Sequence, residues 1–192
     1  MTHEQPGLHF GIAEYGKVCA LRGDHVPALM HYREAMAMAA RQQAPEVVLR
    51  HYLECALESL EQMGAYDELL ACCDRALDHY RAQPPQSDLA RFDLASIHQR
   101  RGVTLLRKGE RDAAAREFET ACATARDANA SLPLAETLRR WLHAQLTITP
   151  QRLAEEQTRH NYRSVRAETV RASLAIPLPG TPKGDAWPST TR

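Results

Sequence analysis

The stretch GVTLLRKGERDAAAREFETA, residues 102–121, decides the fold. A small residue, Gly102, precedes the turn residue Gly109 by seven positions. Ala114, Phe118 and Ala121 then follow at intervals of four and three. Such spacing places the last three side chains on one face of a helix, and a glycine between two helical patterns is typical of a tight turn. The stretch therefore predicts a helix–turn–helix.

The same pattern occurs twice more, closer to the N-terminus. The first copy contains Gly16, Gly23, Asp24, Ala28, Tyr32 and Ala35. The middle copy departs from it and contains Leu57, Gly64, Leu69, Cys73 and Ala76. The turn glycines are 41 and 45 residues apart. Self-similarity at such a period predicts stacked helical hairpins that share one continuous core, an architecture that usually binds partners.

The hairpins are expected at about residues 8–43, 46–82, 88–129 and 132–173. Together they predict one all-α helical repeat domain, residues 1–175, with about eight helices. Asp24 is expected to cap the second helix, and Thr149 followed by Pro150 is expected to begin the last. Five prolines or glycines between residues 177 and 184 predict a flexible, proline-rich tail over 176–192.

With these residues, the chain resembles the tetratricopeptide repeat (TPR) family, in a variant with extended helices. The resemblance covers residues 8–129 clearly and 132–173 weakly. It implies a right-handed α-solenoid whose concave groove, lined by the first helix of each hairpin, binds an extended peptide or a helix. Helical phase gives the partner-binding candidates: Lys17, Leu21, His51, Glu54, Glu58, Glu61, Gln99, Val103 and Arg107.

Three of these candidates form an acidic stripe. Glu54, Glu58 and Glu61 lie on one helix face at spacings of four and three. The stripe suits a basic peptide. The alternative, that these acids only solvate an exposed helix face, stays open.

Composition narrows the class of protein. The 192 residues are 44% hydrophobic with a net charge of zero, yet residues 1–90 balance at −6 and residues 91–192 at +6. Oppositely charged halves allow different partners or a head-to-tail homo-oligomer, and the alternative is that the asymmetry is drift in solvated helix faces without a role. Five cysteines without a CxxC pair, and no apolar run of 18 residues, lead us to expect a cytoplasmic protein without a membrane span.

Chemical sites other than a binding groove have weak signals. His51 and Cys55 are one helical turn apart, and Cys72, Cys73 and His79 could extend them into a metal site, but Cys73 lies at a core position. Cys72 is also a candidate for redox sensing. No phosphate loop, nucleophile elbow or HExxH pair is present, so neither an enzyme nor a cofactor is expected. Arginines near residues 100–111 and 139–171 are interleaved with acids, which disfavours nucleic acid.

We therefore expect a protein–protein interaction module, such as an adaptor, a chaperone-like protein or an assembly factor. Trp187, among the prolines of the tail, is a candidate docking motif for a groove, alternatively a residue without a role. The alternative function is a regulatory sensor whose helix stacking responds to a small ligand or to thiol oxidation.

Overall fold

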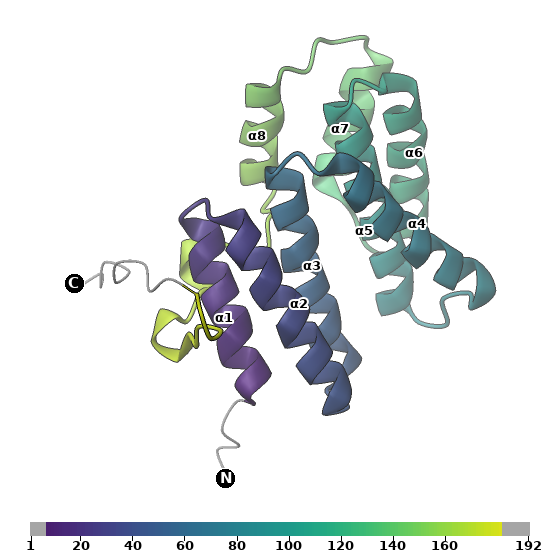
Figure 1. The fold of residues 1–192 in the computed structure, drawn as a ribbon. Helices are drawn as coiled ribbons and strands as arrows, with labels where there is room; N and C mark the ends of the chain where they lie inside the picture. The colour runs from purple at the N-terminus through teal and green to yellow at the C-terminus, as the bar shows by residue number, and fades with distance from the viewer. Residues whose placement is uncertain (1–6, 182–192) are drawn as a thin grey trace. The chain divides into compact units, whose positions relative to one another are not determined.

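The computed structural model describes residues 7–181, which contain eight α-helices and no strand (Figure 1). The predicted all-α class is confirmed. The chain divides into two compact units, each described here by itself. Unit 1 contains the described residues up to Gly64 and those from Arg163 onward, and unit 2 contains Ala65–Tyr162. The boundary at Gly64 falls within the predicted second hairpin.

Unit 1 is built on α1 (Leu8–Leu21), α2 (His25–Arg41) and α3 (Glu46–Gln62). The glycine of the repeat pattern lies against the aromatic ring of the returning helix, because a Cβ on Gly16 would come within 2.7 Å of a ring carbon of Tyr32. Tyr32 is fully buried. One apolar cluster of this unit consists of Ile12, Ala13, Ala35, Ala39 and Tyr52.

Unit 2 is built on α4 (Tyr66–Ala82), α5 (Asp88–Arg107), α6 (Arg111–Asp127), α7 (Pro133–His143) and α8 (Pro150–Arg159). A Cβ on Gly102 would likewise come within 2.7 Å of a ring carbon of Phe118. Buried side chains from α5, α6, α7 and α8 join in one cluster around Phe118, Leu134, Leu138 and Leu153. Unit 2 therefore has an apolar core of its own.

Glycines close the two matched turns. Gly23 and Gly109 have φ values of +84° and +83°, the left-handed region that favours glycine. After each glycine, the next N–H bonds back five residues, Asp24 to the carbonyl of Cys19 and Glu110 to that of Leu105, both at 2.9 Å. This pattern satisfies carbonyl groups that a helix end leaves unpaired.

The predicted helix starts are confirmed in one case and wrong in another. The Thr149 hydroxyl accepts the N–H of Arg152 at the start of α8, with Pro150 as its first residue. Asp24, in contrast, makes no side-chain cap to α2. Its backbone at φ −84° and ψ 67° is not in the extended region typical of a capping residue, because the Asp24 N–H is used to close α1.

The last predicted helix is too long. It was expected to reach about residue 173, but α8 ends at Arg159. Asn161 has φ +49°, and the Tyr162 N–H bonds to the carbonyl of Gln157 at 2.9 Å, which ends the helix as glycine does elsewhere. The chain continues irregularly through two short 3-10 turns, Ala167–Thr169 and Ala172–Leu174.

Part of the predicted flexible tail is also placed against unit 1. The Ile176 N–H donates to the carbonyl oxygen of Gly11, 2.9 Å away. Residues 172–174 lie beside α1, where Figure 1 shows the yellow part of the chain next to the purple helix. Trp187, the predicted docking motif, lies outside the described residues.

Candidate peptide-binding face

The predicted groove residues of unit 1 are mostly enclosed. Lys17 is buried and its Nζ lies 2.8 Å from a carboxylate oxygen of Glu14. Glu58 and Glu61 are also buried. Three more candidates are half-buried: Leu21, His51 and Glu54. The acidic stripe is therefore not an evenly solvated helix face, because two of its three carboxylates are inside the unit.

The predicted groove residues of unit 2 contact its own helices. The side-chain oxygen of Gln99 accepts the N–H of Ala135 in α7, at 3.1 Å. Val103 is fully buried, and Arg107 donates to the side-chain oxygen of Gln157 in α8, at 2.9 Å. Since the two units are not placed relative to each other, the structure does not join the candidates of unit 1 and unit 2 into one surface.

A segment of the chain itself packs against the helices of unit 1. We call residues 163–178 the C-terminal segment. Five of its main-chain N–H groups donate to acceptors on α1, α2 and α3. We call the residues that carry these acceptors the docking face: Gly11, Glu14, His31 and Glu58.

Glu58 binds the beginning of the C-terminal segment. One of its oxygens accepts two successive N–H groups, from Ser164 at 2.9 Å and from Val165 at 3.2 Å. Hydrogen bonds to an ionised group are stronger than neutral ones. The Val165 side chain is only 6% exposed and anchors the segment at this point.

Glu14 binds the middle of the segment. Its two carboxylate oxygens have different partners: one receives the Arg171 N–H at 2.6 Å, and the other pairs with Lys17. Glu14 is 1% exposed, and a carboxylate that is buried so deeply is tolerated only when it is paired and hydrogen-bonded. The Arg171 N–H thus supplies part of what keeps this charge inside the protein.

His31 and Gly11 bind the end of the segment. The Nε2 atom of His31 accepts the Leu178 N–H at 3.1 Å, while Nδ1 donates to the carbonyl of Pro27 at 2.7 Å. Only a neutral imidazole with the proton on Nδ1 makes both bonds. Ile176 packs closely over α1, since a Cβ on Gly11 would come within 2.5 Å of its Cδ1. Gly11 therefore leaves space for an aliphatic side chain.

The docking face is surrounded by groups whose charged forms are disfavoured. Burial lowers the pKa of His51, and Lys17 lowers it further. Burial likewise raises the pKa of Tyr32, with nearby Cys55 and Glu58 adding to the effect. The Tyr32 hydroxyl is buried without a hydrogen-bond partner among the described residues. The interior beside the face is thus a poor medium for charge other than its hydrogen-bonded carboxylates.

Sequence reasoning identified Glu58 but missed Gly11, Glu14 and His31. Glu14 had a signal, because it is the one charged residue in the apolar run Leu8–Gly16. A lone carboxylate on a helix face that faces the core needs partners. Its partner, Arg171, is 157 positions away, and nothing in the sequence connects the two.

The other candidate chemistry finds little support in the described residues. The Sγ of Cys55 and the Nε2 of His51 are 3.9 Å apart, but between residues 7 and 181 no three His, Cys, Asp or Glu side chains are placed to hold a metal ion. Cys72 is half-buried, and Arg75 donates to its sulfur at 3.0 Å. Redox sensing by Cys72 stays a prediction.

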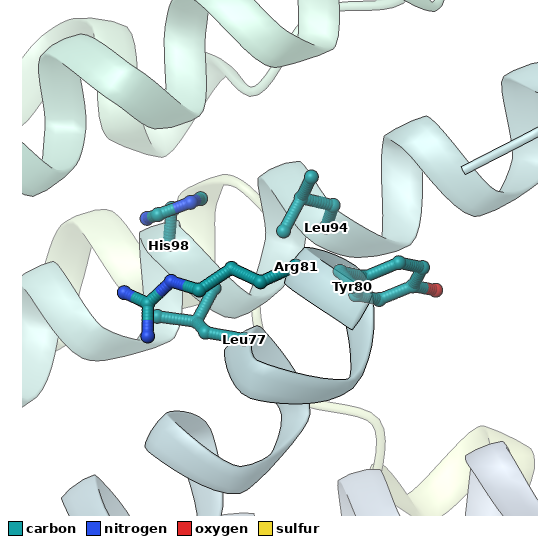
Figure 2. A pocket seen from close by; sticks show the side chains of 5 residues that line it. All are labelled: Leu77, Tyr80, Arg81, Leu94 and His98. Carbon is teal, nitrogen blue, oxygen red and sulfur yellow. The ribbon is translucent and has the colours of Figure 1, made fainter. Parts of the chain in front are cut away.

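Unit 2 has a pocket of about 150 Å³ between α4 and α5 (Figure 2). Leu77, Tyr80, Arg81, Leu94 and His98 line it. Its three polar side chains already have acidic partners. The Tyr80 hydroxyl donates to Asp93 at 2.6 Å, Arg81 bonds to Asp78 at 2.5 Å, and the Nδ1 of His98 lies 2.8 Å from Glu117. The pocket therefore offers mainly an apolar surface to a small ligand, and the sensor function stays a prediction.

No family model, curated protein or solved structure matches the chain. Among residues 7–181, every helix is too short or too polar to cross a membrane.

Proposed function

We propose that the protein is an interaction module with tetratricopeptide-like hairpins, an adaptor or assembly factor whose docking face binds an extended peptide of a protein partner. One observation carries the proposal. The docking face already holds an irregular piece of polypeptide, with two short 3-10 turns, through five main-chain N–H groups. Acceptors arranged for the backbone of a peptide are what a peptide-binding protein requires.

The geometry favours a peptide without α-helical structure over an α-helix. Within a helix, main-chain N–H groups beyond the first turn are bonded internally and cannot reach Glu58 or Glu14. Glu58 takes two successive N–H groups, so proline at either matching position of a ligand removes a bond. Main-chain bonds provide affinity, and the close contact over Gly11 selects an aliphatic side chain in the ligand.

The test is a selection of peptides from a random displayed library on the immobilised full chain. Selected peptides should lose binding to Glu58→Gln and to Glu14→Gln, because each variant removes the charge that accepts their N–H groups. Glu54→Gln is the matched control, since Glu54 is on α3 one turn before Glu58 but is not part of the docking face. Peptides that bind all three variants as well as wild type would contradict the proposal.

A further inference from the structure

We infer that the C-terminal segment is an intramolecular inhibitor: it occupies the docking face and competes there with a partner of its own chemistry, a basic extended peptide. The inference rests on the proposed function and adds the class of partner and the regulation of the site. Four observations carry it, namely the weak apolar contact of the segment, its charge, the nature of its hydrogen bonds and its covalent tether.

Most apolar side chains of the C-terminal segment are only partly buried, including Leu178, which packs against the Tyr52 cluster. Val165 is its only buried residue, while Ile176 remains 41% and Leu174 37% exposed. Hydrophobic burial is the main favourable term in protein folding. A segment that contributes so little of it is expected to open more readily than the core helices, without unfolding of the unit.

The charges of the segment and of its binding helix are complementary. The segment contains three arginines, Arg163, Arg166 and Arg171, and one acid, Glu168. Helix α3 has four glutamates and one arginine. The Arg171 guanidinium also lies 5.9 Å from the centre of the Phe10 ring, at the distance of a cation–π contact. The net negative charge of α3 would also attract a competing peptide that is basic.

The hydrogen bonds of the segment can be made by any peptide. All five use main-chain N–H groups, so they do not depend on which residues the ligand has, except for proline. When the segment leaves, one oxygen of Glu14 keeps its pair with Lys17, and the other loses the Arg171 N–H. The remaining ion pair limits the cost of opening at this buried carboxylate.

The tether decides the competition. The segment belongs to the same chain as the docking face, so its effective concentration there is of the order of millimolar or higher. A free peptide with equal intrinsic affinity is expected to bind poorly until the segment is weakened. A partner therefore displaces the segment only if it binds the docking face more tightly, or if a modification makes the segment bind more weakly.

The experiment measures binding of a fluorescent synthetic peptide, residues 163–181, to full-length variants. Ser164→Pro removes one N–H from Glu58 on the tethered segment and leaves the docking face unchanged. Ala167→Pro is the matched control, because Ala167 is the first residue of a 3-10 turn and Arg166 before it, at φ −137° and ψ 152°, already has the backbone that precedes proline. Ile176→Ser is a second weakening variant, at the Gly11 end.

We expect the peptide to bind Ser164→Pro and Ile176→Ser at least about fivefold more tightly than wild type, the effect of losing one charge-assisted bond or a partly buried contact from the competitor. Ala167→Pro should bind like wild type. Adding Glu58→Gln to Ser164→Pro should cancel the gain. Circular dichroism confirms that the helices are intact in each variant.

The outcomes separate the two proposals. In one outcome, the peptide binds wild type and both weakened variants with equal affinity, and Glu58→Gln abolishes this binding. That result would support the docking face as a peptide site but overturn inhibition by the segment. No binding to any variant, together with faster amide exchange of the segment in Ser164→Pro, would overturn the proposed function as well. A fivefold gain in both weakened variants that Glu58→Gln removes supports both.

Discussion

The α1–α2 hairpin of unit 1 and the α5–α6 hairpin of unit 2 share one scaffold and differ in what covers them. In both, the inner glycine lies against an aromatic ring of the returning helix. In unit 2, α7 and α8 supply buried leucines to the cluster around Phe118. In unit 1, the cover includes the irregular C-terminal segment, held largely by main-chain hydrogen bonds. A common hairpin can therefore support a permanent cover or an exchangeable one.

Two matched positions show how the sequence makes this difference. Two residues before the glycine, unit 1 has Glu14 where unit 2 has Arg100. One residue after it, unit 1 has Lys17 where unit 2 has the fully buried Val103. Arg100 lies 5.0 Å from the centre of the Tyr162 ring, whereas Glu14 binds the Arg171 N–H. Substitution of few residues on one helix face thus changes the kind of cover.

The largest expected effect separates the two covers. Leu138→Ala, in α7, removes a fully buried side chain from the core of unit 2 and should lower the free energy of unfolding of that unit by about 2–5 kcal/mol. Ile176→Ala, in the C-terminal segment, should cost about 1 kcal/mol or less, because that side chain is 41% exposed. Urea unfolding of the full chain measures both. Equal losses of unfolding free energy in the two variants would contradict the proposed difference between the two covers.

A somewhat smaller effect tests the shared scaffold. Gly16→Ala and Gly102→Ala each force a Cβ to within 2.7 Å of a ring and should destabilise their own unit by about 1–3 kcal/mol. Thermal unfolding followed by circular dichroism measures the loss. Gly109→Ala is the control, since an added Cβ there meets nothing within 4 Å and the cost is only backbone strain of about 1 kcal/mol. A larger loss at Gly109 than at Gly102 would contradict the packing explanation.

The next effect depends on pH and belongs to unit 2. Burial opposes ionisation of Glu117, but hydrogen bonds from His98 and Arg101 outweigh it and lower the pKa of Glu117. A folded-state pKa below the unfolded value adds stability above the unfolded pKa, near 4.3, and that stability is lost as the pH falls through the folded pKa. Glu117→Gln should therefore lower the free energy of unfolding of unit 2 by about 1–2 kcal/mol at pH 7. It should also make that free energy fall less steeply as the solution is acidified. Urea unfolding at several pH values measures both, and an unchanged loss of stability in acid would refute this assignment.

The smallest effect concerns one hydroxyl group. Tyr32 and Phe118 are at matched positions, and the Tyr32 hydroxyl is buried without a partner among the described residues. Tyr32→Phe should leave stability unchanged or raise it by about 1 kcal/mol, while Phe118→Tyr should lower it by about 1–3 kcal/mol. Differential scanning calorimetry of the two variants gives the values. A marked loss in Tyr32→Phe would show that the hydroxyl is bonded in solution.

The sequence predicts the helices well because their determinants are local. Gly109 with φ +83°, Thr149 before Pro150 and the spacing of Ala114, Phe118 and Ala121 each act within a few residues. The end of α8 was missed because Asn161 takes the left-handed conformation less readily than glycine and gives a weaker stop signal. The prediction of helix to about residue 173 is wrong, and the Ser164 N–H bonds to Glu58 instead of to a carbonyl of a continued helix.

The candidate site is predicted only in part, because it depends on long-range contacts. Glu58 is a candidate from helical phase, and in the structure it accepts main-chain N–H groups of Ser164 and Val165, while its expected ligand, a basic peptide, stays a prediction. Its partner Ser164 is 106 positions away in the sequence. No local pattern specifies such a pairing. Three other candidates of the same helical phase pack inside unit 2: Gln99, Val103 and Arg107. Helical phase predicts the direction in which a side chain points, but it does not predict which element packs there.

Amide hydrogen exchange of the wild-type full chain tests the central claim most directly. The N–H groups of Ser164, Val165, Arg171 and Leu178 should exchange more slowly than in an unstructured peptide, because they are bonded to the docking face, and much faster than the amide of Phe118 in α6. Exchange of these four amides at the unstructured rate would show that the segment is not docked. Exchange as slow as that of Phe118 would show that it opens only when the protein unfolds, and would contradict an exchangeable cover.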